Sequence, residues 1–321
     1  MSFQTSISSP VVLIFFNRPE LTAQVFAKIK EARPPKLFLI SDGPRSGTPV
    51  EVEKVAASRM VVAEIDWPCE VFRNYSDVNL GCRQRVISGL DWVFSQVDRA
   101  IILEDDCLPN SDFFRFTDEL LERYAQDERV GSIAGTNPLE HFSNHAGESY
   151  SFSRRPDIWG WATWARVWKK YDGDIGDWPA QQKTNLLVEN FHNRRAIRYW
   201  RLALSGVYKK ILDTWDIQLT YHLLKTGQVS VFPVKNLVAN IGFGPDATHT
   251  LDAKNELANL TTFRMDSPLI HPNSIEVNVK YDKERDSRYS PALWKLWLSE
   301  ITRRLPRPIY YFLGAVYNRL R

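Results

Sequence analysis

The sequence predicts an α/β protein with a mostly parallel central sheet flanked by helices. In the first half of the 321-residue chain, short apolar runs alternate with longer segments whose apolar residues recur at helical spacing. Uniformly apolar runs are typical of strands that parallel connections bury on both faces. The composition, 44% apolar and 25% charged, is that of an ordinary folded protein. No apolar run approaches the ~18 residues of a membrane span.

The first strand is predicted over residues 10–16, where the sequence PVVLIFF is continuously apolar. Asn17-Arg18-Pro19 ends this strand, and apolar residues at helical spacing predict a helix over 20–32. The run KLFLIS at 36–41 predicts a second strand, which closes in the turn Asp42-Gly43-Pro44. Strand, helix and strand in this order predict a right-handed βαβ unit.

The alternation continues to residue 134. Thr48-Pro49-Val50-Glu51 has the pattern of a capping box with proline at the first helical position, so a helix is expected to run to about Ile65. Ser111 is expected to cap another helix. The other elements predicted here are strands over 70–73, 100–103 and 130–134 and helices over 81–97 and 111–126.

The pattern changes after residue 150. The elements expected there are a helix that follows WGWATW (159–164) and ends near Tyr171, helices over 193–212 and 215–225, and strands over 229–232 and 236–241. The segment after them is polar and only weakly periodic. We therefore predict a main domain over 1–250, a polar connecting segment over 251–290 and a helical extension over 291–321.

Charge is concentrated at the end of the chain. Residues 291–321 hold six basic side chains and one acidic side chain, which leaves 35 basic and 37 acidic side chains in the remainder. A mildly acidic body argues against nucleic acid as a partner and for one positively charged appendage.

The cysteines and the first residues point to an intracellular protein. Cys69, Cys82 and Cys107 are an odd number without CxxC spacing, so neither a disulfide framework nor a structural zinc site is expected. The first ten residues, MSFQTSISSP, have neither a basic segment nor an apolar core of a signal peptide. We therefore expect a cytoplasmic location.

Polar residues follow three of the predicted strands, at Asn17-Arg18, Ser41-Asp42-Gly43 and Glu104-Asp105-Asp106. Ligands of open parallel sheets bind beyond the carboxyl ends of the strands. Three consecutive carboxylates repel one another unless a cation neutralises them, and Mg²⁺ or Mn²⁺ commonly shares one or two carboxylates with a substrate's phosphates. The triplet thus predicts a metal–diphosphate site, with a solvated acidic turn as the alternative.

These residues belong to segments that resemble a known family. AIILEDDCLPNSDFFRF (100–116) resembles the region of the metal motif in GT-A fold glycosyltransferases. The most similar pattern is that of the N-acetylglucosaminyltransferase I type, in which Glu-Asp-Asp replaces Asp-X-Asp. Other similar segments occur in the same order along residues 10–250: FFNRP (15–19), LISDGP (39–44), NLGCRQRVISGLDWVF (79–94), WGWATWARVW (159–168) and TWDIQ (214–218). The ending NIGFGPDATHT (240–250) is similar to that of bacterial sugar-nucleotide transferases.

The resemblance implies a GT-A, Rossmann-like fold and roles for the acidic triplet. Asp106 is expected to ligate Mn²⁺ or Mg²⁺ directly, Glu104 to face the donor sugar and Asp105 to face the ribose. His249 is expected to contact the metal or the diphosphate once the loop around it closes, although a loop histidine is also an ordinary surface residue.

Other residues are expected to bind the nucleotide-sugar. Asp42 is expected to bond the base or ribose edge, and Asn17 and Arg18 are expected to lie near the nucleotide. Arg83 and Arg85 follow Asn79-Leu80-Gly81 and are either phosphate ligands or solvated helix arginines.

Asp216 is the predicted catalytic base. An inverting transfer needs a carboxylate that takes the proton of the acceptor hydroxyl as its oxygen attacks the anomeric carbon. Trp215 beside it is expected to raise its pKa by desolvation. The alternative role for Asp216 is to cap the helix over 217–225, and the two roles are compatible.

Two functions follow from these expectations. The first is an inverting, metal-dependent glycosyltransferase that moves a sugar from a nucleotide-diphosphate sugar to a glycan or lipid-linked acceptor in bacterial surface polysaccharide assembly. The second is a nucleotidyltransferase or another nucleotide-binding α/β enzyme without sugar transfer. The second is disfavoured because no glycine-rich phosphate loop follows the first strand.

The tail over 291–321 predicts a membrane contact. Apolar residues recur at helical spacing on both sides of Pro306-Arg307-Pro308, and lysine or arginine borders each apolar stripe. Basic amphipathic helices with Trp and Tyr bind anionic bilayers, so we expect peripheral association with the inner face of the plasma membrane. The alternative is that both helices pack on the catalytic domain.

Overall fold

The computed structural model describes residues 7–139, 147–243, 256–258 and 260–291. It divides the chain into two compact units. Unit 1 consists of Met1–Gly173 and Asp213–Asn278, and unit 2 consists of Asp174–Leu212 and Val279–Arg321. The predicted segments 1–250, 251–290 and 291–321 are continuous stretches that were delimited by changes in composition. Each unit of the structure instead combines two stretches that are separate in the sequence.

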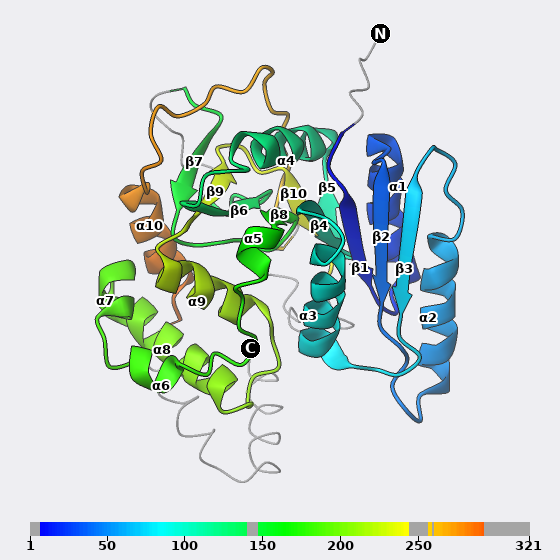
Figure 1. Ribbon diagram of the computed structural model, residues 1–321, viewed down its shortest axis with the longest axis horizontal. Coiled ribbons are helices and arrows are strands. Elements are labelled where there is room, and N and C mark those ends of the chain that lie inside the picture. The colour runs from blue at the N-terminus through cyan, green and yellow to red at the C-terminus, as the bar shows by residue number, and fades with distance from the viewer. Residues whose placement is uncertain (1–6, 140–146, 244–255, 259, 292–321) are drawn as a thin grey trace. The chain divides into compact units, whose positions relative to one another are not determined.

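Unit 1 contains an eight-stranded sheet in the order β3-β2-β1-β4-β8-β6-β9-β7 (Figure 1). The strands are β1 (Val11–Phe15), β2 (Lys36–Ser41), β3 (Glu70–Tyr75), β4 (Arg99–Glu104), β6 (Val130–Ala134), β7 (Tyr150–Ser153), β8 (Trp161–Trp164) and β9 (Val229–Pro233). β8 runs antiparallel to β4 and β6, and β7 runs antiparallel to β9, while the other pairs are parallel. The prediction of an α/β protein with a mostly parallel sheet is confirmed.

Helices cover both faces of this sheet. In unit 1 they are α1 (Pro19–Ala32), α2 (Pro49–Val61), α3 (Gly81–Phe94), α4 (Ser111–Arg123), α5 (Ala165–Trp168) and α9 (Asp216–Thr226). α1 contacts α2 and α4, whereas α3 contacts α5. The chain first adds β2 and β3 outward and then returns past β1 to β4, so right-handed crossovers place α3 on the face opposite to α1 and α2.

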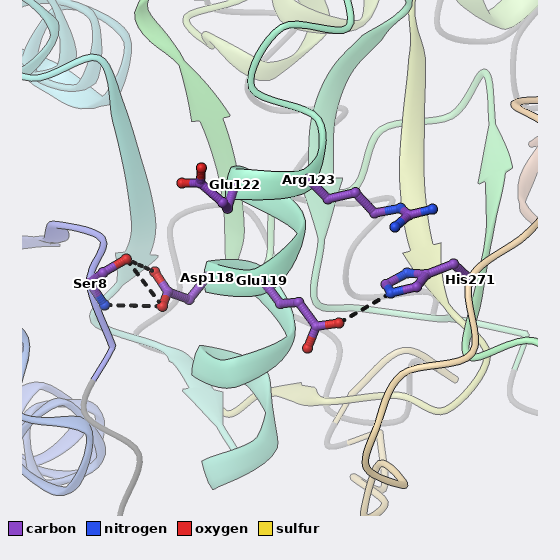
Figure 2. Close-up of a pocket in the computed structure, with 6 residues that line it drawn as sticks. All are labelled: Ser8, Asp118, Glu119, Glu122, Arg123 and His271. Atoms are coloured by element: carbon purple, nitrogen blue, oxygen red, sulfur yellow. Dashed lines mark hydrogen bonds and ion pairs between the residues drawn. The ribbon is translucent and has the colours of Figure 1, made fainter.

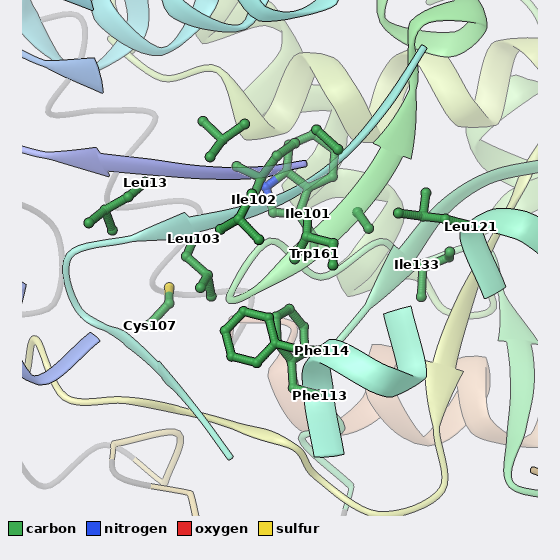
Figure 3. Close-up of a cluster of buried hydrophobic side chains, with 14 of the residues drawn as sticks. Leu13, Ile101, Ile102, Leu103, Cys107, Phe113, Phe114, Leu121, Ile133 and Trp161 are labelled. Carbon is green, nitrogen blue, oxygen red and sulfur yellow. The ribbon is translucent and has the colours of Figure 1, made fainter. Parts of the chain in front are cut away.

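The core lies between the central strands and α4. Ile101, Ile102 and Leu103 of β4 are fully or almost fully buried, and Phe113 and Phe114 at the start of α4 are buried with them (Figure 3). Cys107 belongs to the same buried cluster. Burial on both faces explains why β4 is apolar until it ends at Glu104.

Several local predictions are wrong in ways that have a physical reason. Thr48 makes no side-chain capping bond, and Glu51, the other half of the predicted capping box, instead accepts bonds from the backbone N–H of Arg45 at 2.6 Å and the side-chain amide of Asn17 at 3.0 Å. Asn110, and not Ser111, caps α4 by accepting bonds from the N–H groups of residues 112 and 113.

The sequence-based prediction does not include several short strands that the structure contains. WATW, which was expected only to lead into a helix, forms β8 between β4 and β6. The other unpredicted elements of unit 1 are β7 and β5 (Cys107–Pro109), whereas β10 (Val238–Asn240), the antiparallel partner of β5, lies within the strand predicted over 236–241. Three or four residues carry too little periodicity to be recognised without their hydrogen-bonding partners.

Unit 2 is helical in its described part. α8 (Arg194–Tyr208) contacts α6 (Trp178–Gln181), α7 (Leu186–Asn190) and α10 (Val279–Tyr289). Asn193 caps α8 by accepting a bond from the N–H of Ala196 at 2.8 Å. α10 lies within the segment predicted to be only weakly periodic. It was missed because its buried face includes the polar side chains Asp282 and Asp286.

None of the helices that the structure describes is both long and apolar enough to cross a bilayer. The loop with His249 and the tail from residue 292 onward lie outside the described residues.

Candidate functional site

The three predicted strand ends meet at one edge of the sheet. β1 lies between β2 and β4 and is parallel to both. Phe15 is in register with Ser41, and Ile14 is in register with Glu104. The strand order reverses at β1, and such a reversal is the place where open α/β sheets bind ligands.

Arg18 provides the counter-ion of the acidic triplet. Its guanidinium donates a hydrogen bond to Asp105 Oδ1, and Nη2 lies 3.1 Å from Asp106 Oδ2. The other oxygen of Asp105 accepts the backbone N–H of Phe16 at 3.1 Å. Asp105 is only 3% exposed, whereas Glu104 and Asp106 are partly accessible. The triplet is therefore a structured cluster, unlike the solvated turn that was the alternative.

Two carboxylates of the triplet, Glu104 and Asp105, have pKa values above their ordinary range. Burial raises the pKa of Glu104, and the charges of Asp106, Asp105 and Asp216 add to the increase. Burial also raises the pKa of Asp105, and Arg18 opposes this with its positive charge. Glu104, Asp105, Asp106 and Asp216 are thus close enough to interact electrostatically, with Arg18 as the opposing cation.

Residues from α3 and the loop before α9 join this cluster. Burial, followed by the charges of Glu104, Asp216 and Asp213, raises the pKa of the Cys82 thiol to about 12. Asp213 is also close to the start of α3, because a Cβ placed on Gly81 would lie 3.3 Å from Asp213 Oδ2. Sequence reasoning missed Cys82 and Asp213. The only signals were that Cys82 follows Asn79-Leu80-Gly81 and that Asp213 lies three residues before Asp216.

Asp216 is the first residue of α9, and its carboxylate is oriented by the preceding loop. The hydroxyl of Thr214 donates a hydrogen bond to Asp216 Oδ1. The N-cap position is Trp215, and within the described residues no backbone N–H of α9 donates to the Asp216 carboxylate. The structure therefore does not bear out the capping alternative.

Aromatic packing holds the loop that carries Asp216. Trp215 stacks on Trp161 with ring centroids 5.5 Å apart. The hydroxyl of Tyr171 donates to the carbonyl of Trp215 at 2.9 Å, and Tyr171 itself stacks on Trp168 at 4.5 Å. The orientation of Asp216 thus depends on β8 and α5.

Asp42 caps a helix that is distant in sequence. Its carboxylate accepts the backbone N–H groups of Leu80 at 2.9 Å and Gly81 at 3.0 Å, at the beginning of α3. It also accepts the N–H of Gly43 at 2.9 Å and the side-chain amide of Asn79 at 3.1 Å. These donors occupy both oxygens of a side chain that is 6% exposed. The predicted contact of Asp42 with a base or ribose stays a prediction.

The other predicted nucleotide ligands also bond within the protein. Asn17 donates to Glu51, as described above, and Arg83 Nη2 donates to the carbonyl of Gly173 at 2.7 Å. Arg85 is buried and donates to Asn74 Oδ1 at 2.9 Å. Arg85 is therefore not a solvated helix arginine.

The side chains at this edge fit a metal that is shared with a ligand. Among the described residues, no three His, Cys, Asp or Glu side chains are grouped as the ligands of a metal ion. A hard dication commonly takes one or two carboxylates and completes its shell with phosphate and water oxygens. Asp106 and Glu104 suit that arrangement and do not make an all-protein cage.

The segment after β10 lies directly over Asp106. The carbonyl of Asp106 accepts the N–H of Ile241 at 2.9 Å, and a Cβ on Gly242 would lie 2.3 Å from Asp106 Oδ2. Only glycine permits this approach. The backbone at Gly242 therefore packs against the carboxylate of Asp106.

The tryptophans of WGWATW have different surroundings. Trp161 and Trp164 are buried in the core. Trp159 is only partly buried, and it packs edge-on against Phe243 with centroids 5.7 Å apart. Trp159 is thus the one of the three with surface left for a ligand.

A separate hollow lies beside α4, next to the chain that enters β1 (Figure 2). Asp118 accepts the N–H groups of Ser8 at 3.0 Å and Ser9 at 2.8 Å. Across the hollow, His271 Nε2 lies 3.3 Å from Glu119 Oε1. Because Ser8 and Ser9 precede β1, this hollow is at the opposite end of β1 from the acidic triplet.

No protein-family model matches the chain, and no curated protein matches it either.

Proposed function

We propose that the protein is an inverting, metal-dependent glycosyltransferase of the GT-A fold that uses a nucleotide-diphosphate sugar. The observation that supports this most is the convergence of Glu104 and Asp106, at the end of β4, with Asp216, at the start of α9. A transferase of this kind needs carboxylates for a cation and a separate carboxylate for the acceptor. In this proposal Glu104 and Asp106 serve the cation and Asp216 serves the acceptor, near the edge where the strand order reverses.

Each carboxylate has a proposed role. Asp106, with Glu104 beside it, would hold Mn²⁺ or Mg²⁺, which when bound offsets the negative charge of the leaving diphosphate. Asp216 accepts the proton of the acceptor hydroxyl, and the Thr214 hydroxyl keeps its carboxylate in one orientation. Arg18 pairs with Asp105 and Asp106, and in this proposal it also supplies a second cation to the diphosphate.

The proposed partners follow from the predicted tail. The acceptor is a glycan or a lipid-linked sugar in the assembly of a bacterial surface polysaccharide. The basic segment 291–321 would bring the enzyme to the inner face of the plasma membrane, where such an acceptor is located.

The first experiment measures the hydrolysis of a panel of sugar nucleotides in the presence of Mn²⁺. We expect turnover of at least one donor. Turnover of none, together with binding of a nucleoside triphosphate, would favour the nucleotidyltransferase alternative.

Two substitutions then test the assignments. Asp106→Asn should abolish metal-dependent donor binding, because an amide is a poorer ligand for a hard dication. Asp216→Asn should keep donor affinity and lower kcat at least ~100-fold, the usual scale for a general base. Asp77→Asn, at an exposed position, is the matched control and should leave both unchanged. Loss of donor affinity in Asp216→Asn would instead indicate a structural role.

A further inference from the structure

Charge is divided unequally between the two units. Unit 2 holds 17 basic and 7 acidic side chains, a net charge of +10, while unit 1 has a net charge of −7. The tail accounts for only part of this difference. Without residues 292–321, unit 2 still holds 11 basic and 6 acidic side chains.

α8 presents part of this charge on one surface. Arg194, Arg201 and Tyr208 are spaced by seven residues, or nearly two helical turns, and all three are exposed. The helix contains no acidic residue. Its opposite side, with Ala196 and Ala203, is buried.

The same surface continues beyond the end of the helix. Lys209 and Lys210 directly follow α8 and are exposed. Tyr208 is 42% exposed and Ile211 is 51% exposed, so apolar side chains flank the two lysines. We call Arg194, Arg201, Tyr208 and Lys209–Ile211 the α8 face.

The cations of the α8 face have no acidic partners among the described residues. Some half-buried lysines of unit 1 pair with carboxylates, as Lys28 does with Glu31 at 2.7 Å and Lys30 does with Asp66 at 3.0 Å. Neither Arg194 nor Arg201 forms such an ion pair with any residue that the structure describes, and the same holds for Lys209–Lys210. Their charge is therefore available to an external anion.

We propose that the α8 face binds the anionic surface of a lipid bilayer. Exposed cations attract anionic headgroups, and a tyrosine with an aliphatic side chain suits the boundary between headgroups and acyl chains. Nucleic acid would use the cations and leave Ile211 without a favourable contact. This inference rests on the membrane part of the proposed function, to which it adds a second contact in unit 2. It does not depend on sugar transfer.

The test uses the full chain with four substitutions, R194Q/R201Q/K209Q/K210Q, and sedimentation with vesicles of equal parts phosphatidylcholine and phosphatidylglycerol. Each basic residue near an anionic surface favours binding by roughly fivefold, so we expect the partition coefficient to fall at least ~20-fold at low salt. The control K54Q/K169Q/K170Q/R264Q removes four exposed charges from unit 1 and should bind like the wild type. High salt should reduce the difference.

Three results would overturn the inference. The first is a quadruple variant that binds vesicles as well as the wild type does, which would leave the tail as the whole contact. The second is an equal loss of binding in the control. The third is a larger loss of binding to double-stranded DNA than to vesicles. Donor hydrolysis, measured in parallel without lipid, reports on the transferase proposal separately, and we expect it to be unchanged in both variants.

Discussion

Replacing Asp42 by alanine is expected to destabilise unit 1 strongly, because Asp42 is a buried carboxylate that accepts several hydrogen bonds. The same replacement of an exposed, unpaired acidic residue is expected to have little effect. The Asp42 carboxylate accepts the backbone N–H groups of Gly43, Leu80 and Gly81 and the side-chain amide of Asn79, over 2.9 to 3.1 Å. Alanine leaves these donors without an acceptor. It also removes a negative charge from the N-terminus of α3, where such a charge is favourable.

The size of the effect follows from these four bonds. A hydrogen bond to a charged group contributes about 1.5–3 kcal/mol, and bonds to one carboxylate are not additive. Because water can reach part of the site after truncation, we expect a loss of about 3–5 kcal/mol in the free energy of unfolding. Asn79→Ala removes one neutral donor group, which bonds both Asp42 and the carbonyl of Gly43, and should cost only about 1–2 kcal/mol.

Urea unfolding followed by circular dichroism measures these differences, and hydrogen exchange at Leu80 and Gly81 locates them. Asp77→Ala is the matched control, since Asp77 is exposed and close in sequence to the same loop. The reasoning is refuted if Asp42→Ala unfolds at the wild-type urea concentration. It is also refuted if the variant loses only donor affinity, which would make Asp42 a nucleotide ligand without a capping role.

Three other predictions concern the carboxylates. Thr214→Val should lower kcat about tenfold or more with an unchanged KM, because a bond to a charged group is worth about 1.5 kcal/mol or more, and Thr214→Ser should restore it. The pKa of Glu104 is higher in the folded protein than its ordinary value of 4.5, so the folded state binds the proton more tightly than the unfolded state does. The stability of the wild type should therefore fall as the pH rises above 4.5 toward alkaline values. Glu104→Gln should flatten that dependence in melting temperatures measured across pH, and an unchanged slope would contradict it. Arg18→Gln should destabilise the protein at neutral pH by about 3–5 kcal/mol and recover partly in acid, where the buried Asp105 becomes protonated. Equal destabilisation at every pH would show that the charge of Arg18 is not the cause.

The sequence alone was sufficient for the parallel half of the sheet. β1, β2 and β4 are buried on both faces, so their residues are continuously apolar, and polar residues begin where each strand ends. Carboxyl ends of neighbouring parallel strands share one edge of a sheet. The adjacency of Arg18, Asp42 and the acidic triplet could therefore be predicted before any contact was known.

Contacts between distant residues were decided only by the tertiary structure. Asp42 followed by glycine has the appearance of an ordinary turn, and nothing near it in sequence shows that its carboxylate caps a helix 39 residues away. The strand WATW is too short to have a recognisable period, and its place between β4 and β6 depends on hydrogen bonds to both.

The same division applies to the candidate site. The acidic triplet was predictable because its position follows from one local pattern, a buried strand that ends in carboxylates. The counter-ion role of Arg18, the Thr214 bond that orients Asp216 and the proximity of Cys82 depend on which side chains the packed core brings together. The pattern of buried residues depends on neighbouring positions in the sequence and can be read from it. The partner that neutralises a buried charge comes from a distant part of the chain and depends on the three-dimensional packing.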